Sequence, residues 1–329
     1  MNARWEGKEL LQPITAEEPC GQSLEDTQLL ASFDAFRLFG QATPLEPVPE
    51  WVAIRNSAIE ALNKSKDLRL LAHLGTALLR TDGLPAFSET LTVASEWLTS
   101  YWTQLYPLVD EDAMLRRNAL NCFADPMAVV DGIRRLPLVS SRQHGTYSLR
   151  DIDIASGQAQ PSNGERRVDE AQINAAFAEM PLEELTAAQQ SAAGALAALR
   201  RVDAVMRESA GPSAAPDFDP LTAQLGKVDR VLRAQLAARP DGPGAEAGNS
   251  EPGTAGGTAA VGAIKSRQDA IRALDAVANF FRQTEPSSPV PLFIERAKRL
   301  VAKDFLEVLA DIAPDGLGQA RSAGGLRDE

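Results

Sequence analysis

One stretch near the end of the chain limits the possible folds most, because it cannot belong to a packed domain. Residues 239–262, RPDGPGAEAGNSEPGTAGGTAAVG, contain seven glycines and three prolines in 24 positions, with no apolar residue larger than valine. Such a segment cannot bury enough apolar surface to offset the entropy lost on ordering, so we expect a flexible linker. As a random coil it would span about 27 Å root-mean-square. The folded parts must therefore lie on either side of a tether.

The block at 8–155 carries the clearest helical pattern. Seven apolar residues are spaced alternately by three and four positions, which places them on one face of a helix: Leu84, Phe87, Leu91, Ala94, Leu98, Tyr101 and Leu105. Pro85 suits the first turn of this helix, and Pro107 ends the pattern. All four tryptophans lie in the first third of the chain, so we expect the core of large side chains there.

The same block predicts helices on both sides of this one. Residues 65–80 form a helix with Ser65 as its N-cap and Gly83 as its stop. Residues 136–155 lack a helical period and predict a hairpin or an extended arm. The remaining two helices are marked by apolar residues at helical spacing, before and after: Trp51, Ile54, Ala58 and Leu62, then Leu115, Ala119 and Cys122.

A second block, 166–238, is also helical. Periodic patterns cover 168–180 and 182–207, and a third helix begins at Asp219 and Pro220, with Asp as its N-cap. The predicted fold class is therefore all-α, with an N-terminal helical domain (8–155), a helical middle domain (166–238), the linker (239–262) and a small C-terminal domain (263–329).

The C-terminal domain should be a helical hairpin that assembles with copies of itself. Its first helix begins near Ile264, and its second follows Ser288 as N-cap and runs to Ile312. A hairpin of this size is marginal alone, and it has no metal or disulfide to stabilise it, so self-association is the simplest stabiliser. We predict that four residues face subunit neighbours as well as the hairpin's own core: Ile294, Val301, Phe305 and Val308.

Charge and composition exclude several classes of function. The formal net charge is −12, so the phosphates of nucleic acids and anionic membranes would repel the chain. No apolar run is long enough to span a bilayer, and no secretory signal is expected at the N-terminus. Two cysteines, Cys20 and Cys122, do not make a disulfide framework and fit a reducing cytoplasm.

The residues capable of chemistry do not form a specific catalytic pattern. His73 lies on a leucine-rich helix, where a structural role is expected, and Cys122 is expected to be a buried, inert thiol. Asp110, Glu111 and Asp112 could hold a cation, yet their position at a helix start explains them equally well. The segment 257–266 resembles a phosphate loop, but its lysine is misplaced and no strand precedes it. We therefore expect no cofactor, no metal and no catalytic residue.

Five stretches of the sequence together resemble a known family. Four lie in the N-terminal block: LLQPITAEEPCGQSLED (10–26), SKDLRLLAHLGTALLRTDGLPAF (65–87), YWTQLYPLVDEDAMLRRNAL (101–120) and PLVSSRQHGTYSLRDI (137–152). The fifth is the C-terminal segment EPSSPVPLFIERAKRLVAKDFLEVLADIAPDG. The N-terminal block resembles the ImpA N-terminal domain of TssA proteins, components of the bacterial type VI secretion system, and the C-terminal segment resembles the end of their short, baseplate-type forms.

The resemblance implies a cytoplasmic, non-enzymatic assembly factor. Its partners would be further copies of itself, in a ring, and the baseplate, sheath, tube and membrane-complex proteins of the secretion system. Two alternatives stay open. One is a helical adaptor or chaperone scaffold outside a secretion machine. The other is a hydrolase using His144 with Ser141 or Cys20, although no nucleophile elbow is present.

Overall fold

Helix α5 (Leu84–Ser100) is the central element of the first part of the chain in this computed structural model. The structure describes residues 5, 7–109, 113–162 and 168–239, and in the C-terminal part 271, 274–275, 277–279, 281–282 and 289–301, without the side chains of 291 and 299–301. The chain divides into two compact units, residues 1–249 and 250–329.

The fold is mostly helical, which confirms the predicted class. Among the described residues, a two-stranded antiparallel hairpin is the sheet structure present. The elements of the first unit are, in order, α1 (Lys8–Leu11), α2 (Gln28–Asp34), α3 (Trp51–Leu62), α4 (Leu68–Thr81), α5, α6 (Met114–Asn121), the 3-10 turn η1 (Cys122–Ala124), the π-helix η2 (Pro126–Val130), α7 (Asp131–Arg135), β1 (Pro137–Ser141), β2 (Gly145–Ser148), α8 (Leu149–Ala155), α9 (Glu170–Glu179), α10 (Leu182–Ala210), η3 (Pro212–Ala214) and α11 (Asp219–Ala237).

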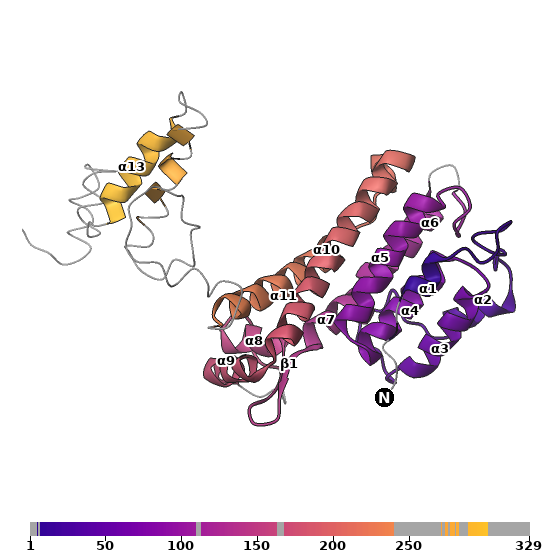
Figure 1. Cartoon of the computed structure of the whole chain (residues 1–329), viewed down its shortest axis with the longest axis horizontal. Helices are drawn as coiled ribbons and strands as arrows, with labels where there is room; N and C mark the ends of the chain where they lie inside the picture. The colour runs from indigo at the N-terminus through magenta and orange to yellow at the C-terminus, as the bar shows by residue number, and fades with distance from the viewer. Residues whose placement is uncertain are drawn as a thin grey trace, which may run out of the picture. The chain divides into compact units, whose positions relative to one another are not determined.

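The helices of the first unit pack in a row. Helix α4 packs against α3 on one side and α5 on the other; α5 in turn packs along α10, and α10 against α11. Figure 1 shows α5 and α10 side by side over much of their length. The 166–238 block therefore lies directly against the 8–155 block, within one compact unit and over one continuous apolar core.

The central helix is shorter than its apolar spacing predicts. Helix α5 ends at Ser100, and Tyr101 occupies the C-cap, so the predicted continuation to Leu105 is wrong. Leu105 is nevertheless fully buried. Arg116, distant in sequence, donates hydrogen bonds to the carbonyls of Trp102 and Leu105 and so holds the residues after Ser100 in their non-helical course.

Three further local predictions need correction. Asp67, not Ser65, is the N-cap of α4, because its carboxylate accepts from Arg69 N at 2.8 Å. Ser65 instead pairs with Gly21 in an isolated bridge. The predicted hairpin holds for 137–148, but 149–155 forms α8, whose N-cap Ser148 makes a capping box with Asp151. Asp219, also predicted as a cap, is the first helical residue of α11 rather than its N-cap.

The second unit is described in part. Its main element is α13 (Val290–Val301). Residues 271–282 are helical wherever they are described. The Lys298 ammonium reaches the Asp275 carboxylate at 2.5 Å, and Arg282 pairs with Glu295 at 2.8 Å, so the two segments lie together.

Several predicted features lie outside the described residues. They are the linker after Arg239, the acidic Asp110, Glu111 and Asp112, the loop-like 257–266, the cap Ser288, and the stretch of the last predicted helix beyond Val301, which includes Phe305 and Val308.

Candidate protein-interaction site

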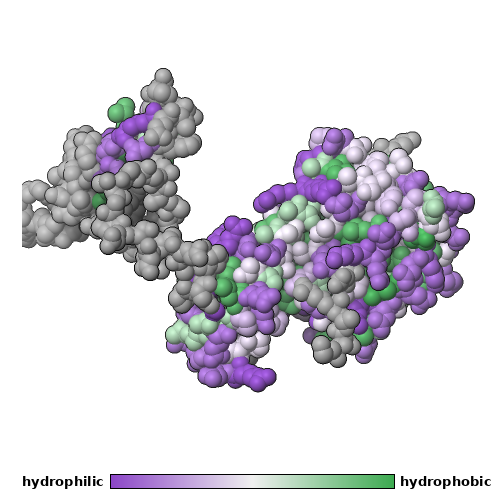
Figure 2. Space-filling model, in the orientation of Figure 1, coloured by the Kyte–Doolittle hydropathy of each residue, from purple (hydrophilic) through white to green (hydrophobic). Residues whose placement is uncertain are grey.

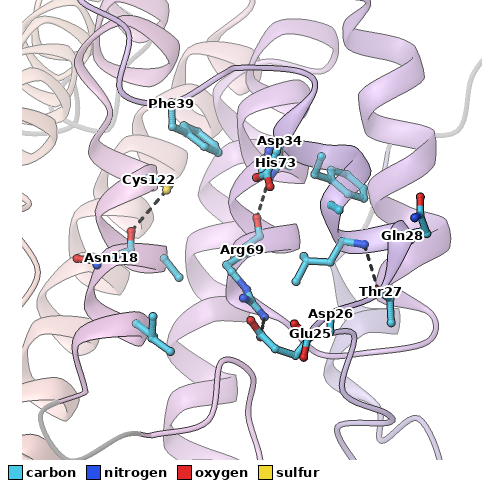
Figure 3. A pocket seen from close by; sticks show the side chains of 15 residues that line it. Glu25, Asp26, Thr27, Gln28, Asp34, Phe39, Arg69, His73, Asn118 and Cys122 are labelled. Carbon is cyan, nitrogen blue, oxygen red and sulfur yellow. Dashed lines mark hydrogen bonds and ion pairs between the residues drawn. The ribbon is translucent and has the colours of Figure 1, made fainter.

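The first unit has a well-formed hollow between α2 and α6, with α4 as its floor. Its cavity volume is about 550 Å³, a size typical of binding pockets. Figure 3 shows Arg69 and His73 between Thr27 and Gln28 on one side and Asn118 and Cys122 on the other. We call this the α2–α6 groove; it is lined by eight residues within 25–34, by Phe39, by Arg69 and His73, and by Leu115, Asn118, Ala119 and Cys122.

His73 forms the floor of the groove as a neutral ring packed among aromatic side chains. The ring centroids of Phe33 and Phe39 lie 5.1 Å and 4.8 Å from that of His73, both nearly edge-on. Its Nδ1–H donates to the Arg69 carbonyl at 2.9 Å. Burial lowers the pKa of His73 below its ordinary value, so the ring is uncharged near neutral pH. These contacts agree with the structural role predicted from the sequence.

Arg69 is held by two carboxylates and offers little charge to the groove. Its Nη2 lies 2.7 Å from Asp67 Oδ2 and 2.7 Å from Glu25 Oε2. The hydrogen bond from Arg69 lowers the pKa of Glu25, and the paired carboxylates raise the pKa of Arg69. The guanidinium thus joins the start of α4 to the segment before α2.

Two further carboxylates in the groove are unpaired. Asp26 and Asp34 both line it and are exposed. In the part of the chain that the structure describes, neither side chain makes a hydrogen bond or an ion pair. Asp26 has a backbone φ of 59°, a conformation that Asn and Asp tolerate better than most residues. The groove therefore carries uncompensated negative charge.

Asp125 fixes the inner end of the groove. Its carboxylate accepts from Gly40 N at 2.7 Å and from Ala128 N at 2.8 Å. One side chain thus caps η2 and holds the loop after α2, which carries Phe39.

Exposed apolar side chains lie along the outer rim. Leu115, which lines the groove, is 52% exposed, although the helical pattern predicted it on an apolar face. Met114 beside it is also exposed, as are Leu108 and Val109 on the other side of 110–112. Figure 2 shows a mainly hydrophilic surface on its visible face, with separate apolar patches.

Two of the residues considered for hydrolysis, Ser141 and His144, do come together, but in an arrangement unsuited to catalysis. Ser141 Oγ donates to the Glu179 carboxylate and accepts from His144 N at 2.9 Å. His144 Nε2 lies 3.4 Å from Glu179 Oε1. In a catalytic triad the histidine stands between the serine and the acid; here the acid stands between the other two. The contacts join the turn of the hairpin to α9.

Neither cysteine has the surroundings of a reactive thiol. Cys20 is buried, and burial raises its pKa. Cys122 is only partly buried, which corrects the expectation, and it lines the α2–α6 groove. Desolvation and the nearby Asp125 raise the pKa of Cys122 to about 11, so the thiol is protonated near neutral pH.

The predicted oligomerisation residues are described only in part. Ile294 is 9% exposed, so it packs within the second unit, as does Ala278. Leu292 and Phe293 are 75% and 68% exposed. The side chains of Val301, Phe305 and Val308 lie outside the described residues.

Membrane-spanning helices are not found in the described parts of the chain, where no helix combines the necessary length and apolar character.

Comparisons with known proteins agree on one family. A family model described as ImpA, N-terminal, type VI secretion system, matches residues 11–125. Over 343 positions the chain is 32% identical to the type VI secretion system component TssA1 of Pseudomonas aeruginosa, covering 97% of this chain and 98% of that protein.

A solved structure shares the fold of the first unit. It is the N-terminal domain, including the conserved ImpA_N region, of the TssA component from Burkholderia cenocepacia, with a TM-score of 0.56 and 23% identity. The match covers 70% of this chain and 93% of that chain. Since the similarity to TssA1 extends over nearly the full length of both proteins, this chain belongs to the TssA family of type VI secretion system components.

Proposed function

We propose that this chain is a non-enzymatic structural component of the type VI secretion baseplate. It acts in the cytoplasm, forms a multimeric ring, recruits the baseplate to the membrane complex and primes assembly of tube and sheath. The observation that carries this proposal is the similarity to TssA1, which covers 97% of this chain and 98% of that protein. The similarity also disfavours an adaptor outside a secretion machine.

The exposed apolar side chains of the second unit support the proposed ring. Its described helices are held together by the ion pairs Lys298–Asp275 and Arg282–Glu295, while Leu292 and Phe293 stay exposed. Large apolar side chains exposed on so small a unit favour contact with another copy. The seam predicted from the sequence, Ile294, Val301, Phe305 and Val308, would be a second apolar surface for contact between copies.

The arrangement at the hairpin supports a non-enzymatic role. The Ser141 hydroxyl donates its hydrogen bond to Glu179 rather than to the His144 ring. Its oxygen accepts hydrogen bonds from the backbone N–H groups of Gln143 and His144. In a Ser-His-acid triad the serine hydroxyl donates to the histidine, which the acid orients; here no histidine nitrogen accepts from Ser141.

The test is sheath assembly in the strain that carries this chain. The gene is deleted, the sheath protein is fluorescently labelled, and the strain is complemented with wild type, His144→Ala or Val301→Asp. We expect wild type and His144→Ala to restore sheath formation and Val301→Asp to fail. Normal sheath formation in the deletion strain would contradict the assembly role, and failure of His144→Ala at normal protein levels would revive the hydrolase.

A further inference from the structure

The α2–α6 groove is an apolar hollow that the described part of the chain leaves unfilled. Phe33 and Phe39 lie beside His73 at its floor, and Ala119 lines the α6 wall. The inner end is fixed by the bond from Gly40 N to Asp125. A groove held open in this way is preformed, so a ligand need not first order it.

The charge of the groove selects the kind of ligand. Three carboxylates line it, those of Glu25, Asp26 and Asp34, against one guanidinium, that of Arg69. Arg69 is already bound to Asp67 and Glu25, and His73 is neutral. The charges of the groove that remain unpaired are therefore those of the Asp26 and Asp34 carboxylates. These carboxylates attract Lys or Arg and repel phosphates, which disfavours a nucleic acid or an anionic lipid surface.

The walls of the groove select the conformation of the ligand. Both walls, α2 and α6, are helices, so they offer no strand edge to which an extended peptide could add. A helix docked between two helices needs only side-chain contacts. The exposed Leu115 on the rim would meet its apolar face.

We propose that the α2–α6 groove binds an amphipathic helical segment of a partner protein. The segment places aliphatic or aromatic side chains over Phe39 and Leu115, and Lys or Arg beside Asp26 and Asp34. This adds a surface and a partner chemistry to the assembly role proposed above.

The test is a selection from displayed random peptides, each about four helical turns long, on the full-length chain. The comparison is a groove variant with Asp26→Asn, Asp34→Asn and Leu115→Ser; asparagine tolerates the positive φ of residue 26. A matched control carries Glu17→Gln, Glu18→Gln and Val52→Ser. It makes the same change of charge and polarity at exposed positions outside the groove. Circular dichroism and thermal melting establish that all three proteins fold alike.

We expect selected peptides to combine apolar residues at helical spacing with Lys and Arg. In fluorescence anisotropy, they should bind the wild type and the matched control equally. Binding to the groove variant should be at least about tenfold weaker, the loss expected for one apolar contact and two charge contacts. Added salt should weaken binding to the wild type more than to the groove variant.

Three results would overturn the proposal: peptides that bind all three proteins equally, selected peptides rich in Asp and Glu, or a groove variant whose own oligomeric mass changes. The last would assign the groove to a second copy of the chain. Because binding is measured on the isolated protein, its failure is distinct from a failure of sheath assembly.

Discussion

Two buried cations, Lys66 and Arg116, are bound largely by backbone carbonyls. Lys66 Nζ donates to the carbonyls of Leu10 and Gln12 at 2.5 and 2.7 Å and lies 4.9 Å from the ring centroid of Trp97. Burial lowers the pKa of Lys66. These bonds hold the N-terminal segment, including α1, against the residues that precede α4. A lysine in a sequence carries no mark of such burial, so neither role could be predicted.

Arg116 gives the sharpest prediction at the scale of single residues. Its guanidinium donates to the carbonyls of Trp102, Leu105 and Pro107 and lies over the Trp102 ring. Arg116→Met leaves buried carbonyls without these donors, so the free energy of unfolding should fall by about 3 kcal/mol or more. Urea denaturation measures it.

The neighbouring arginine provides the control for this loss. Arg117 is partly exposed and donates to the Ser213 carbonyl at 3.0 Å. Arg117→Met should cost less than about 1 kcal/mol. Equal losses for the two variants would show that Arg116 does no more than an ordinary surface arginine.

His73 predicts how stability depends on pH. Its pKa is lowered in the folded state from the ordinary 6.5, so below pH 6.5 the unfolded chain binds a proton that the folded chain does not. The free energy of unfolding should therefore decrease as the pH falls below 6.5, until the pH passes the folded pKa. The slope attributable to this group is at most about 1.4 kcal/mol per pH unit.

The variant His73→Leu should flatten this pH dependence. Leu78→Ala, in the same helix and fully buried, destabilises without adding or removing a titrating group and should keep the wild-type slope. Denaturation at several pH values between about 5 and 7.5 compares the three. An unchanged slope in His73→Leu would contradict the assignment.

At the scale of elements, two glycines in helix interiors should respond oppositely to alanine. A Cβ on Gly75 of α4 would lie 2.8 Å from Thr90 Oγ1 and 3.2 Å from Phe123 Cε1, whereas one on Gly226 of α11 meets nothing within 4 Å. Gly75→Ala should cost about 1–3 kcal/mol by overpacking between α4 and α5. Gly226→Ala should stabilise by about 0.5–1 kcal/mol. Thermal denaturation of both variants checks this; a shift of melting temperature in the same direction for both would be inconsistent with the helix packing.

Local periodicity predicted most elements of the first unit. It failed where contacts between residues far apart in the sequence determine where a helix begins or ends. The spacing of Leu84 to Leu98 gave α5, but its end depends on Arg116. The sequence predicted Ser65 as the N-cap of α4. In the structure Ser65 pairs with Gly21, and Asp67 caps the helix.

The groove could not be predicted in the same way. Its lining comes from 25–39, 69–73 and 115–122, which no local pattern connects. Leu115 has the spacing of a core residue and is exposed. Of the lining residues, His73 and Cys122 were considered for chemistry, and His73 correctly as structural. The unpaired state of Asp26 and Asp34 follows from where Arg69 points, which only the structure shows.

At the scale of the whole molecule, the first unit offers the groove to partners and the second unit is proposed to bring copies of the chain together. The central claim of this account is that assembly depends on the second unit. It predicts that a change in the seam alters oligomeric mass while the helices of the first unit remain folded, because the two compact units have separate cores.

The most direct measurement is the molar mass of the full-length chain by light scattering at micromolar concentration, for wild type and Val301→Asp. An aspartate without a partner in a buried apolar seam is costly, so we expect a multimer for the wild type and a much smaller mass for the variant, with unchanged helical content in the first unit. A wild-type chain that is a folded monomer, or a Val301→Asp variant with the full multimeric mass, would contradict the claim.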